Sequence, residues 1–243
     1  MLQACLNGSR TRRFHPAVPI TPEEAAADAR AVVAAGAAEL HIHARGPDGL
    51  ESLDPADVAA LLDAVRASVP GIPVGLSTGW WIRPGGRARQ DPMHHWTSLP
   101  DYVSVNLIEE DAPEVIALML GMGVGVEAGL WSVADARRFL ALPQAQGCLR
   151  VLIEINEQDE SEGLAVAEAI LAELDGAGMT LPRLLHGADR TVWPLYREAL
   201  RRGLDARIGL EDGADLPDGG IARDNAALIA AATGLAATGE ARG

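Results

Sequence analysis

The chain has 243 residues, close to the roughly 250 that an α/β barrel needs, so a single domain spanning 1–243 is expected. Apolar residues make up 48% of the sequence, but no apolar run approaches the roughly 18 residues of a membrane span. The formal net charge of −14 disfavours a nucleic acid or an anionic membrane as partner, because both would be repelled. The first residues lack the basic start and long apolar stretch of a signal peptide, which favours a cytoplasmic protein acting on a small molecule.

All 20 basic residues are arginine, and the absence of lysine excludes several kinds of chemistry. Schiff-base catalysis, a pyridoxal phosphate linkage and a P-loop each require a lysine amine. A carbonyl substrate would therefore have to be polarised by a metal ion or by hydrogen-bond donors. The two cysteines, Cys5 and Cys148, lie far apart and outside any Cys-x-x-Cys pattern. A thiolate zinc site is therefore not expected, and both side chains are predicted to be buried.

Short runs rich in Val, Ile and Leu alternate with longer Ala-rich runs of helical period, which is the pattern of parallel βαβ units. The clearest helix, 25–35, begins with the capping box Thr21-Pro22-Glu23-Glu24 and ends at Gly36. Length and even spacing favour a (β/α)8 TIM barrel over an open doubly wound sheet. The expected strands are 3–6, 39–44, 73–78, 102–107, 124–130, 149–155, 183–186 and 206–211, and the other expected helices are 58–69, 161–174, 192–202 and 223–236.

His41-Ile42-His43 ends the second expected strand, where alternation sends both imidazoles to one face. Two neutral imidazoles on one face suit zinc or a similar divalent ion, although a single buried histidine is more often a hydrogen-bonded core residue. Barrel closure brings the last strand close to the second, so Glu211 can complete a set of two histidines and one carboxylate with one position open. The neighbouring acids Glu211 and Asp212 could instead be a solvated strand end.

Asp212 is expected next to the metal but off the strand face of Glu211, where it can act as a general base. Arg207 shares the alternation of Glu211 but lies about 13 Å further down the strand, where a buried ion pair with Glu127 is one expectation. Glu127 and Glu154 point into the same barrel, and either is an alternative metal ligand.

Strand-end hydroxyls and amides are expected to surround the metal position and bind substrate. These residues are Ser77, Thr78 and Asn106, with His186 as a further acid or base. Cationic loop residues at the same end could receive a carboxylate or phosphate, or could be solvated surface residues. They are Arg10, Arg12, Arg13, Arg83, Arg87 and Arg89. The loop histidines His15, His94 and His95 are expected to be solvated.

The order of motifs along the chain resembles the β-keto acid cleavage enzyme family. The matching segments are His15-Pro16-Ala17-Val18-Pro19, Thr21-Pro22-Glu23-Glu24, Ala35-Gly36-Ala37-Ala38, His41-Ile42-His43-Ala44-Arg45, Ser77-Thr78-Gly79, Glu127, Arg207-Ile208-Gly209-Leu210-Glu211-Asp212 and Ala222-Arg223-Asp224-Asn225-Ala226. The resemblance implies a zinc-dependent barrel, with one Zn²⁺ per chain, that condenses a β-keto acid with acetyl-CoA and releases acetoacetate and a new CoA ester. It also implies a homo-oligomer.

The resemblance assigns roles residue by residue. It implies that His41, His43 and Glu211 bind the metal, that Asp212 is the catalytic acid or base with Arg207 and Glu127 as charged partners, and that Ser77 binds substrate. The chain departs from the family at Asn7-Gly8-Ser9-Arg10, where an acidic residue is usual, and at Ile153-Glu154-Ile155-Asn156, where an apolar, glycine-containing strand end is usual. Two alternatives therefore remain: another metal-dependent aldolase, isomerase or hydrolase on the same barrel, and a non-catalytic small-molecule-binding barrel.

Overall fold

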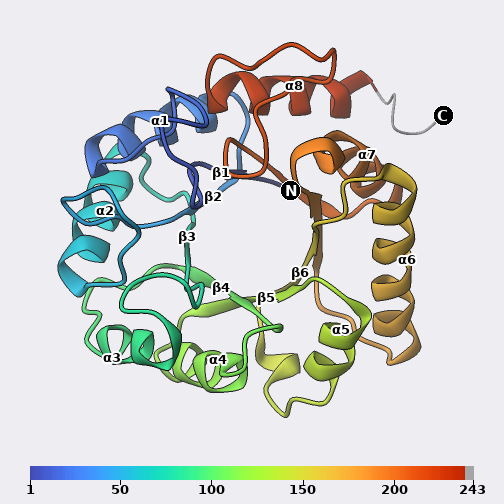
Figure 1. The fold of residues 1–243 in the computed structure, drawn as a ribbon, viewed down its shortest axis with the longest axis horizontal. Coiled ribbons are helices and arrows are strands. Elements are labelled where there is room, and N and C mark those ends of the chain that lie inside the picture. Colours follow the sequence, from blue (N-terminus) through green and yellow to red (C-terminus); the bar gives the residue numbers. More distant parts are fainter. Residues whose placement is uncertain (239–243) are drawn as a thin grey trace.

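Eight strands pair in parallel, each with the next along the chain and the last with the first, so the sheet closes into a barrel. The computed structural model describes residues 1–238, and Figure 1 looks down this barrel. The predicted (β/α)8 fold is confirmed, although the second and eighth strands end earlier than the sequence predicts. The strands are β1 (Leu2–Cys5), β2 (Glu39–Ile42), β3 (Val74–Ser77), β4 (Tyr102–Asn106), β5 (Gly125–Leu130), β6 (Arg150–Ile155), β7 (Arg183–Gly187) and β8 (Asp205–Ile208).

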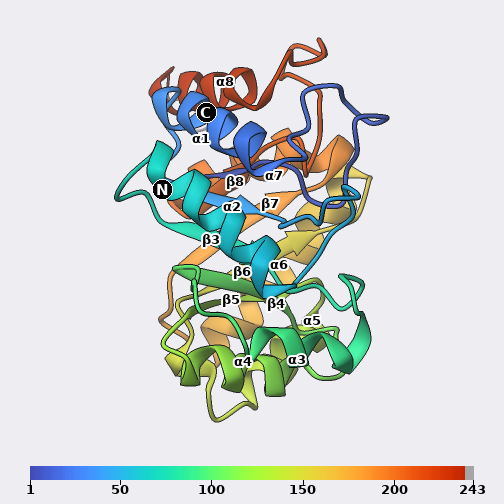
Figure 2. The same ribbon diagram turned by 90° about the vertical axis from the view of Figure 1, so that its left-hand side faces the viewer.

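Helices form the outer layer of the barrel, and Figures 1 and 2 show α8 beside α1 at the seam where the barrel closes. They are α1 (Pro22–Ala34), α2 (Pro55–Ser68), α3 (Gln90–Met93), α4 (Ala112–Gly121), α5 (Val133–Leu140), α6 (Glu160–Gly176), α7 (Val192–Arg202) and α8 (Asn225–Thr238). None of the helices in this part of the chain combines the length and apolar character needed to cross a membrane.

The predicted capping box of α1 is present. The Thr21 hydroxyl accepts from the Glu24 N–H, and the Glu24 carboxylate accepts from the Thr21 N–H. Gly36 follows the end of this helix with a φ of 116°, a backbone angle that glycine adopts at little cost. The last helix, in contrast, reaches Thr238, two residues past its predicted end at 236.

A polar network fills the lower part of the barrel interior. Glu127 accepts hydrogen bonds from Gln3 Nε2 at 2.8 Å and from Arg150 Nε at 2.6 Å. Arg150 also pairs with Glu39, and Gln3 donates to the Tyr102 hydroxyl at 3.0 Å. This network forms a closed floor, so the functional space lies above it, at the carboxyl ends of the strands.

Candidate metal centre and barrel cavity

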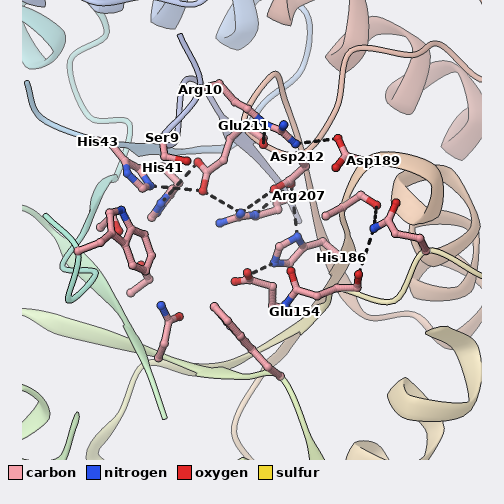
Figure 3. A pocket seen from close by; sticks show the side chains of 18 residues that line it. Ser9, Arg10, His41, His43, Glu154, His186, Asp189, Arg207, Glu211 and Asp212 are labelled. Carbon is pink, nitrogen blue, oxygen red and sulfur yellow. Dashed lines mark hydrogen bonds and ion pairs between the residues drawn. The ribbon is translucent and has the colours of Figure 1, made fainter. Parts of the chain in front are cut away.

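A cavity of about 450 Å³ lies above the polar floor, and Figure 3 shows the side chains that surround it. Its wall combines the strand ends with the loops that follow β1, β3, β5, β6, β7 and β8. Ser77, Ser104 and Asn106 line one side, while Glu154 and His186 line another. This is the face on which barrel enzymes build their active sites.

Three side chains that can bind a metal converge in this cavity. The ligand atoms of His41, His43 and Glu211 all lie within 4.8 Å of one another. His41 Nε2 is 3.7 Å from Glu211 Oε2, and His43 Nε2 is 3.4 Å from Glu211 Oε1. His43 Nε2 and Glu211 Oε2 are buried without a hydrogen-bond partner among residues 1–238. Two imidazole nitrogens and a carboxylate oxygen are the donor set of a catalytic zinc site, so the residues fit this ion.

The strand geometry and two neighbouring side chains orient the histidines. His41 lies on β2, and His43 follows the end of that strand on the same inward face. Asn7 accepts from the His43 backbone N–H at 2.9 Å and donates to the His43 carbonyl at 3.1 Å. Glu51 Oε1 lies 2.5 Å from His43 Nδ1, which leaves Nε2 directed at Glu211. A carboxylate behind a histidine ligand fixes its tautomer and orientation.

Glu211 reaches the histidines from a turn rather than from a strand. β8 ends at Ile208, and the N–H groups of Asp212 and Gly213 both donate to the carbonyl of Gly209. The chain must turn here because Gly209 lies against the β1 backbone, where a Cβ would come within 1.8 Å of the Cys5 carbonyl oxygen. The predicted strand over 206–211 is therefore too long at its carboxyl end.

The turn places Glu211 and Asp212 on the same guanidinium group, in contrast to the predicted separation on opposite faces. Arg207 Nη2 donates to Glu211 Oε1 at 3.0 Å and to Asp212 Oδ1 at 2.7 Å. The expected ion pair between Arg207 and Glu127 is absent from the described residues, because Arg150 and Gln3 bind Glu127. Asp212 Oδ2 also accepts from the Cys5 thiol at 3.0 Å.

Burial and ion pairing set the charge of these groups. Burial lowers the pKa of His41 to about 3, which favours the neutral imidazole that binds metals. Burial also disfavours charge on His43, but the carboxylates of Glu211 and Glu51 outweigh it and raise its pKa to about 9. Burial acts against ionisation of Asp212, yet Arg207 and His186 lower its pKa to about 2. Asp212 is therefore ionised at neutral pH.

The structure separates the predicted site residues into two groups. His41, His43, Ser77, Asn106, His186, Arg207, Glu211 and Asp212 all line the cavity. Thr78 does not, because its buried hydroxyl donates to the Ser104 carbonyl at 2.7 Å. Glu127 belongs to the floor and does not contact Asp212, so the structure does not bring it to the proposed base.

The loop cations and histidines also differ from expectation in part. Arg10 lines the cavity, whereas Arg89 is fully buried between Glu109 and Asp111 and cannot receive a ligand. His15, predicted to be solvated, is buried with Nε2 2.9 Å from the Ala222 carbonyl oxygen. Both cysteines are buried and free, as expected.

Several cavity residues were not predicted from the sequence. Ser104, Trp81 and Trp131 line the cavity, and Glu51 supports His43 from a loop. Alternation along the fourth strand could have identified Ser104, because it shares the inward face with Asn106. The contacts of Glu51 and the tryptophans depend on loop conformation, which no local pattern specifies.

A closed barrel with a buried cluster of two histidines and a carboxylate, beside an acid held by arginine, defines a (β/α)8 protein with a candidate metal centre at its carboxyl end. The model of the β-keto acid cleavage enzyme family matches residues 1–122 and 153–242 of this sequence. The chain therefore belongs to the β-keto acid cleavage enzyme family, which confirms the resemblance seen in its motifs.

Relatives agree with this assignment, and solved structures share the fold. The 3-oxoadipate:acetyl-CoA acetyltransferase of Cupriavidus necator is 28% identical over 262 residues, covering 97% of this chain and 87% of that protein. The 3-keto-5-aminohexanoate cleavage enzyme of Fusobacterium nucleatum is 36% identical over 69 residues, covering 28% of this chain and 25% of that protein. A ternary complex of ObcA with a C4-CoA adduct and oxalate has the same fold, with a TM-score of 0.76 at 16% identity over 92% of this chain. This chain spans only 65% of the ObcA chain.

Proposed function

We propose that this protein is a Zn²⁺-dependent enzyme that condenses a β-keto acid with acetyl-CoA and cleaves the product into acetoacetate and a new acyl-CoA. The observation that carries the proposal is the convergence of His41, His43 and Glu211 in the barrel cavity, with Asp212 held next to them. Family membership and the names of the relatives support the use of a β-keto acid and acetyl-CoA. The chemistry of the three ligand groups supports zinc.

His41, His43 and Glu211 would hold the ion and leave a position open toward the cavity. When bound, the ion would polarise the ketone of the substrate and stabilise the enolate that forms from it. The buried, unpartnered atoms His43 Nε2 and Glu211 Oε2 support this assignment, because such atoms are costly unless a ligand or ion satisfies them.

Asp212 would move the proton of the reacting carbon. Arg207 and the Cys5 thiol hold its carboxylate in place, and Arg207 keeps it ionised, which a general base requires. Ser77 and Asn106 present a hydroxyl and an amide to the cavity, where they can bind substrate oxygens. These donors lie in a buried wall, so they would act with little competition from water.

Metal analysis and an activity assay test the proposal together. We expect near one zinc per chain in wild type purified without added metal, and loss of both the zinc and the acetyl-CoA-dependent cleavage in His41→Ala and Glu211→Ala. His94→Ala, which removes an exposed histidine, serves as the matched control and should retain both. Folded wild type that neither contains zinc nor takes it up would refute the metal assignment. Cleavage of a keto acid without acetyl-CoA would instead favour an aldolase.

A further inference from the structure

Glu154 and His186 form a pair of side chains in the cavity wall. The proposed reaction gives Glu154 no role. The two residues are register partners on the neighbouring strands β6 and β7, so their side chains lie next to each other. Both line the cavity, and Figure 3 shows them on the side of Arg207 away from His41 and His43. The pair therefore faces the metal centre across the space that a substrate would fill.

His186 is almost completely buried and its hydrogen-bonding capacity is unused. Neither ring nitrogen has a hydrogen-bond partner among the described residues. Its closest acidic neighbours are Asp212 Oδ2, 3.4 Å from Nδ1, and Glu154 Oε2, 3.8 Å from Nε2. A buried polar side chain without a partner is costly, so this imidazole is arranged to meet a group that enters the cavity.

Glu154 differs from the other acids in the cavity. Burial raises the pKa of Glu154, and no hydrogen bond or arginine holds its carboxylate in the described part of the chain. Arginines hold the remaining cavity acids: Arg207 binds Glu211 and Asp212, and Arg10 binds Asp189. The Glu154 side chain is partly exposed to the cavity, and its unpaired carboxylate is an acceptor available to a ligand there.

We propose that Glu154 and His186 form a subsite for a hydrogen-bond donor, a hydroxyl or an ammonium group, on the part of the β-keto acid that lies away from the metal. A hydroxyl can donate to Glu154 and accept from His186, and an ammonium can donate to both. A carboxylate would meet Glu154 with like charge. This inference rests on the proposed function, because the metal centre fixes the other end of the same substrate.

The alternative to a donor-binding subsite is an anion-binding site at Arg10, a cation of the cavity wall that could bind an anionic substrate. Its guanidinium is already engaged, with Nη2 2.7 Å from Asp189 Oδ1 and Nε 3.2 Å from the Glu211 carbonyl oxygen. An incoming carboxylate would have to compete with Asp189, whereas a donor at Glu154 displaces nothing. The subsite therefore selects against a substrate with a second carboxylate.

Calorimetric titration tests the subsite independently of turnover. The zinc-loaded protein is titrated, without acetyl-CoA, with four six-carbon 3-oxo acids whose far end carries a methyl, hydroxyl, ammonium or carboxylate group. We expect the hydroxyl or the ammonium form to bind at least about tenfold more tightly than the methyl form, since a hydrogen bond to a charged group contributes that much. The carboxylate form should bind no more tightly than the methyl form.

Variants assign the preference to the subsite. Glu154→Gln keeps the shape and an acceptor oxygen, so it should remove most of a preference for ammonium and only part of a preference for hydroxyl, which distinguishes the two donors. Asp189→Asn is the matched control: it removes another cavity carboxylate at a φ of 48° that asparagine tolerates, and the donor preference should persist. Tightest binding of the carboxylate form, or a donor preference unchanged in Glu154→Gln, would overturn the proposal.

The two proposals fail in distinguishable ways. Donor-selective binding without any acetyl-CoA-dependent cleavage would contradict the proposed function and leave the subsite standing. Cleavage of keto acids with no donor preference would support the proposed function and overturn the subsite. The circular dichroism spectrum and the melting temperature of Glu154→Gln should match those of wild type, which would show that lost binding comes from the removed charge and not from unfolding.

Discussion

His43 lies between two carboxylates, and the one outside the metal cluster sets its orientation. Glu51 Oε1 lies 2.5 Å from Nδ1 and also accepts from Trp81 Nε1 at 3.1 Å. We predict that Glu51→Gln raises the zinc dissociation constant by about 10- to 100-fold, the usual effect of losing such a support. Competition with a chelating dye measures this constant. Glu110→Gln, at a highly exposed carboxylate, is the control, and equal zinc affinity in the two variants would show that Glu51 does not orient the ligand.

Gly8 provides the space that Glu211 occupies. Its φ is 53°, and a Cβ added there would lie 2.4 Å from Glu211 Cγ. We predict that Gly8→Ala destabilises the fold by about 1–2 kcal/mol through its backbone angle and also displaces Glu211, so that zinc binding is lost. Gly178→Ala carries a similar backbone cost at a φ of 67° but has no atom within 4 Å of the added Cβ. Zinc content by mass spectrometry should separate the variants; equal zinc content in both would contradict the role of Gly8.

Residue patterns located the candidate metal ligands better than the side chains around them. His41 and His43 follow from strand alternation, which is a local property of the sequence. The clamp of Asn7 on His43 and the support from Glu51 join residues 36 and 8 positions apart, and only the folded loops bring them together. The pairing of Glu154 with His186 likewise depends on the register of two strands, which the sequence does not specify.

At the level of elements, the contact between α1 and α8 contains a largely buried carboxyl group, that of Asp28. Burial raises the pKa of Asp28 to about 7, although the hydrogen bond that Asn225 Nδ2 donates at 2.6 Å opposes the shift. Because the folded pKa lies above the unfolded value, the stability that Asp28 contributes is complete below about pH 4 and is lost as the pH rises through about 7.

We therefore predict that Asp28→Asn is more stable than wild type at pH 8, by about 2–4 kcal/mol, and nearly equally stable near pH 4. A pKa raised from its ordinary value of 3.8 to about 7 corresponds to about 4 kcal/mol, and the partial exposure of Asp28 reduces this value. Asparagine keeps the shape and an oxygen that accepts from Asn225, so the substitution removes mainly the charge. Urea unfolding at a series of pH values measures the difference. Asp63→Asn, at an exposed position on α2, should show no such trend. A constant difference between Asp28→Asn and wild type across this range would contradict the prediction.

The sequence predicted the helices and strands whose residue pattern is regular. It did not predict element ends and helices that depend on tertiary contacts. All eight strands were located, but the eighth was extended to 211 because the apolar run continues past the turn that Gly209 makes against β1. The helices α3, α4 and α5 were not predicted, and α3 has only 4 residues. α4 is apolar on nearly all sides, so it lacks a clear helical period, and α5 has only 8 residues. Their positions follow from the barrel, which requires a connection between successive strands.

At the scale of the whole molecule, the barrel interior is divided into a closed polar floor and an open cavity. The floor explains why Glu127, which the family resemblance placed with the site, does not line the cavity. Its Oε1 accepts hydrogen bonds from Arg150 and Gln3 within the floor. Inward-facing residues of a barrel strand occupy successive layers. Sequence alternation identifies the inward face but does not show which layer borders the cavity.

The candidate metal centre joins parts of the molecule that are distant in sequence, so we expect zinc to stabilise the entire barrel. His41 lies on β2 and His43 directly follows it, whereas Glu211 comes from the turn after β8, on the other side of β1, where the barrel closes. A ligand that binds only the folded state at about 1,000 times its dissociation constant stabilises by about 4 kcal/mol. For a domain of this size we predict a rise in melting temperature of roughly 10 °C on zinc addition, reversed by a chelator.

The same experiment on His41→Ala separates specific binding from a general effect of the ion. Without one imidazole the cluster keeps a single histidine and Glu211, so the zinc-dependent rise should fall to a few degrees at most. The chelated wild type should melt close to chelated His94→Ala, which lacks only an exposed surface side chain. An equal rise in wild type and His41→Ala would place the stabilising zinc elsewhere on this acidic protein. No rise in either would mean that the cluster holds its shape through Arg207 and the buried hydrogen bonds alone.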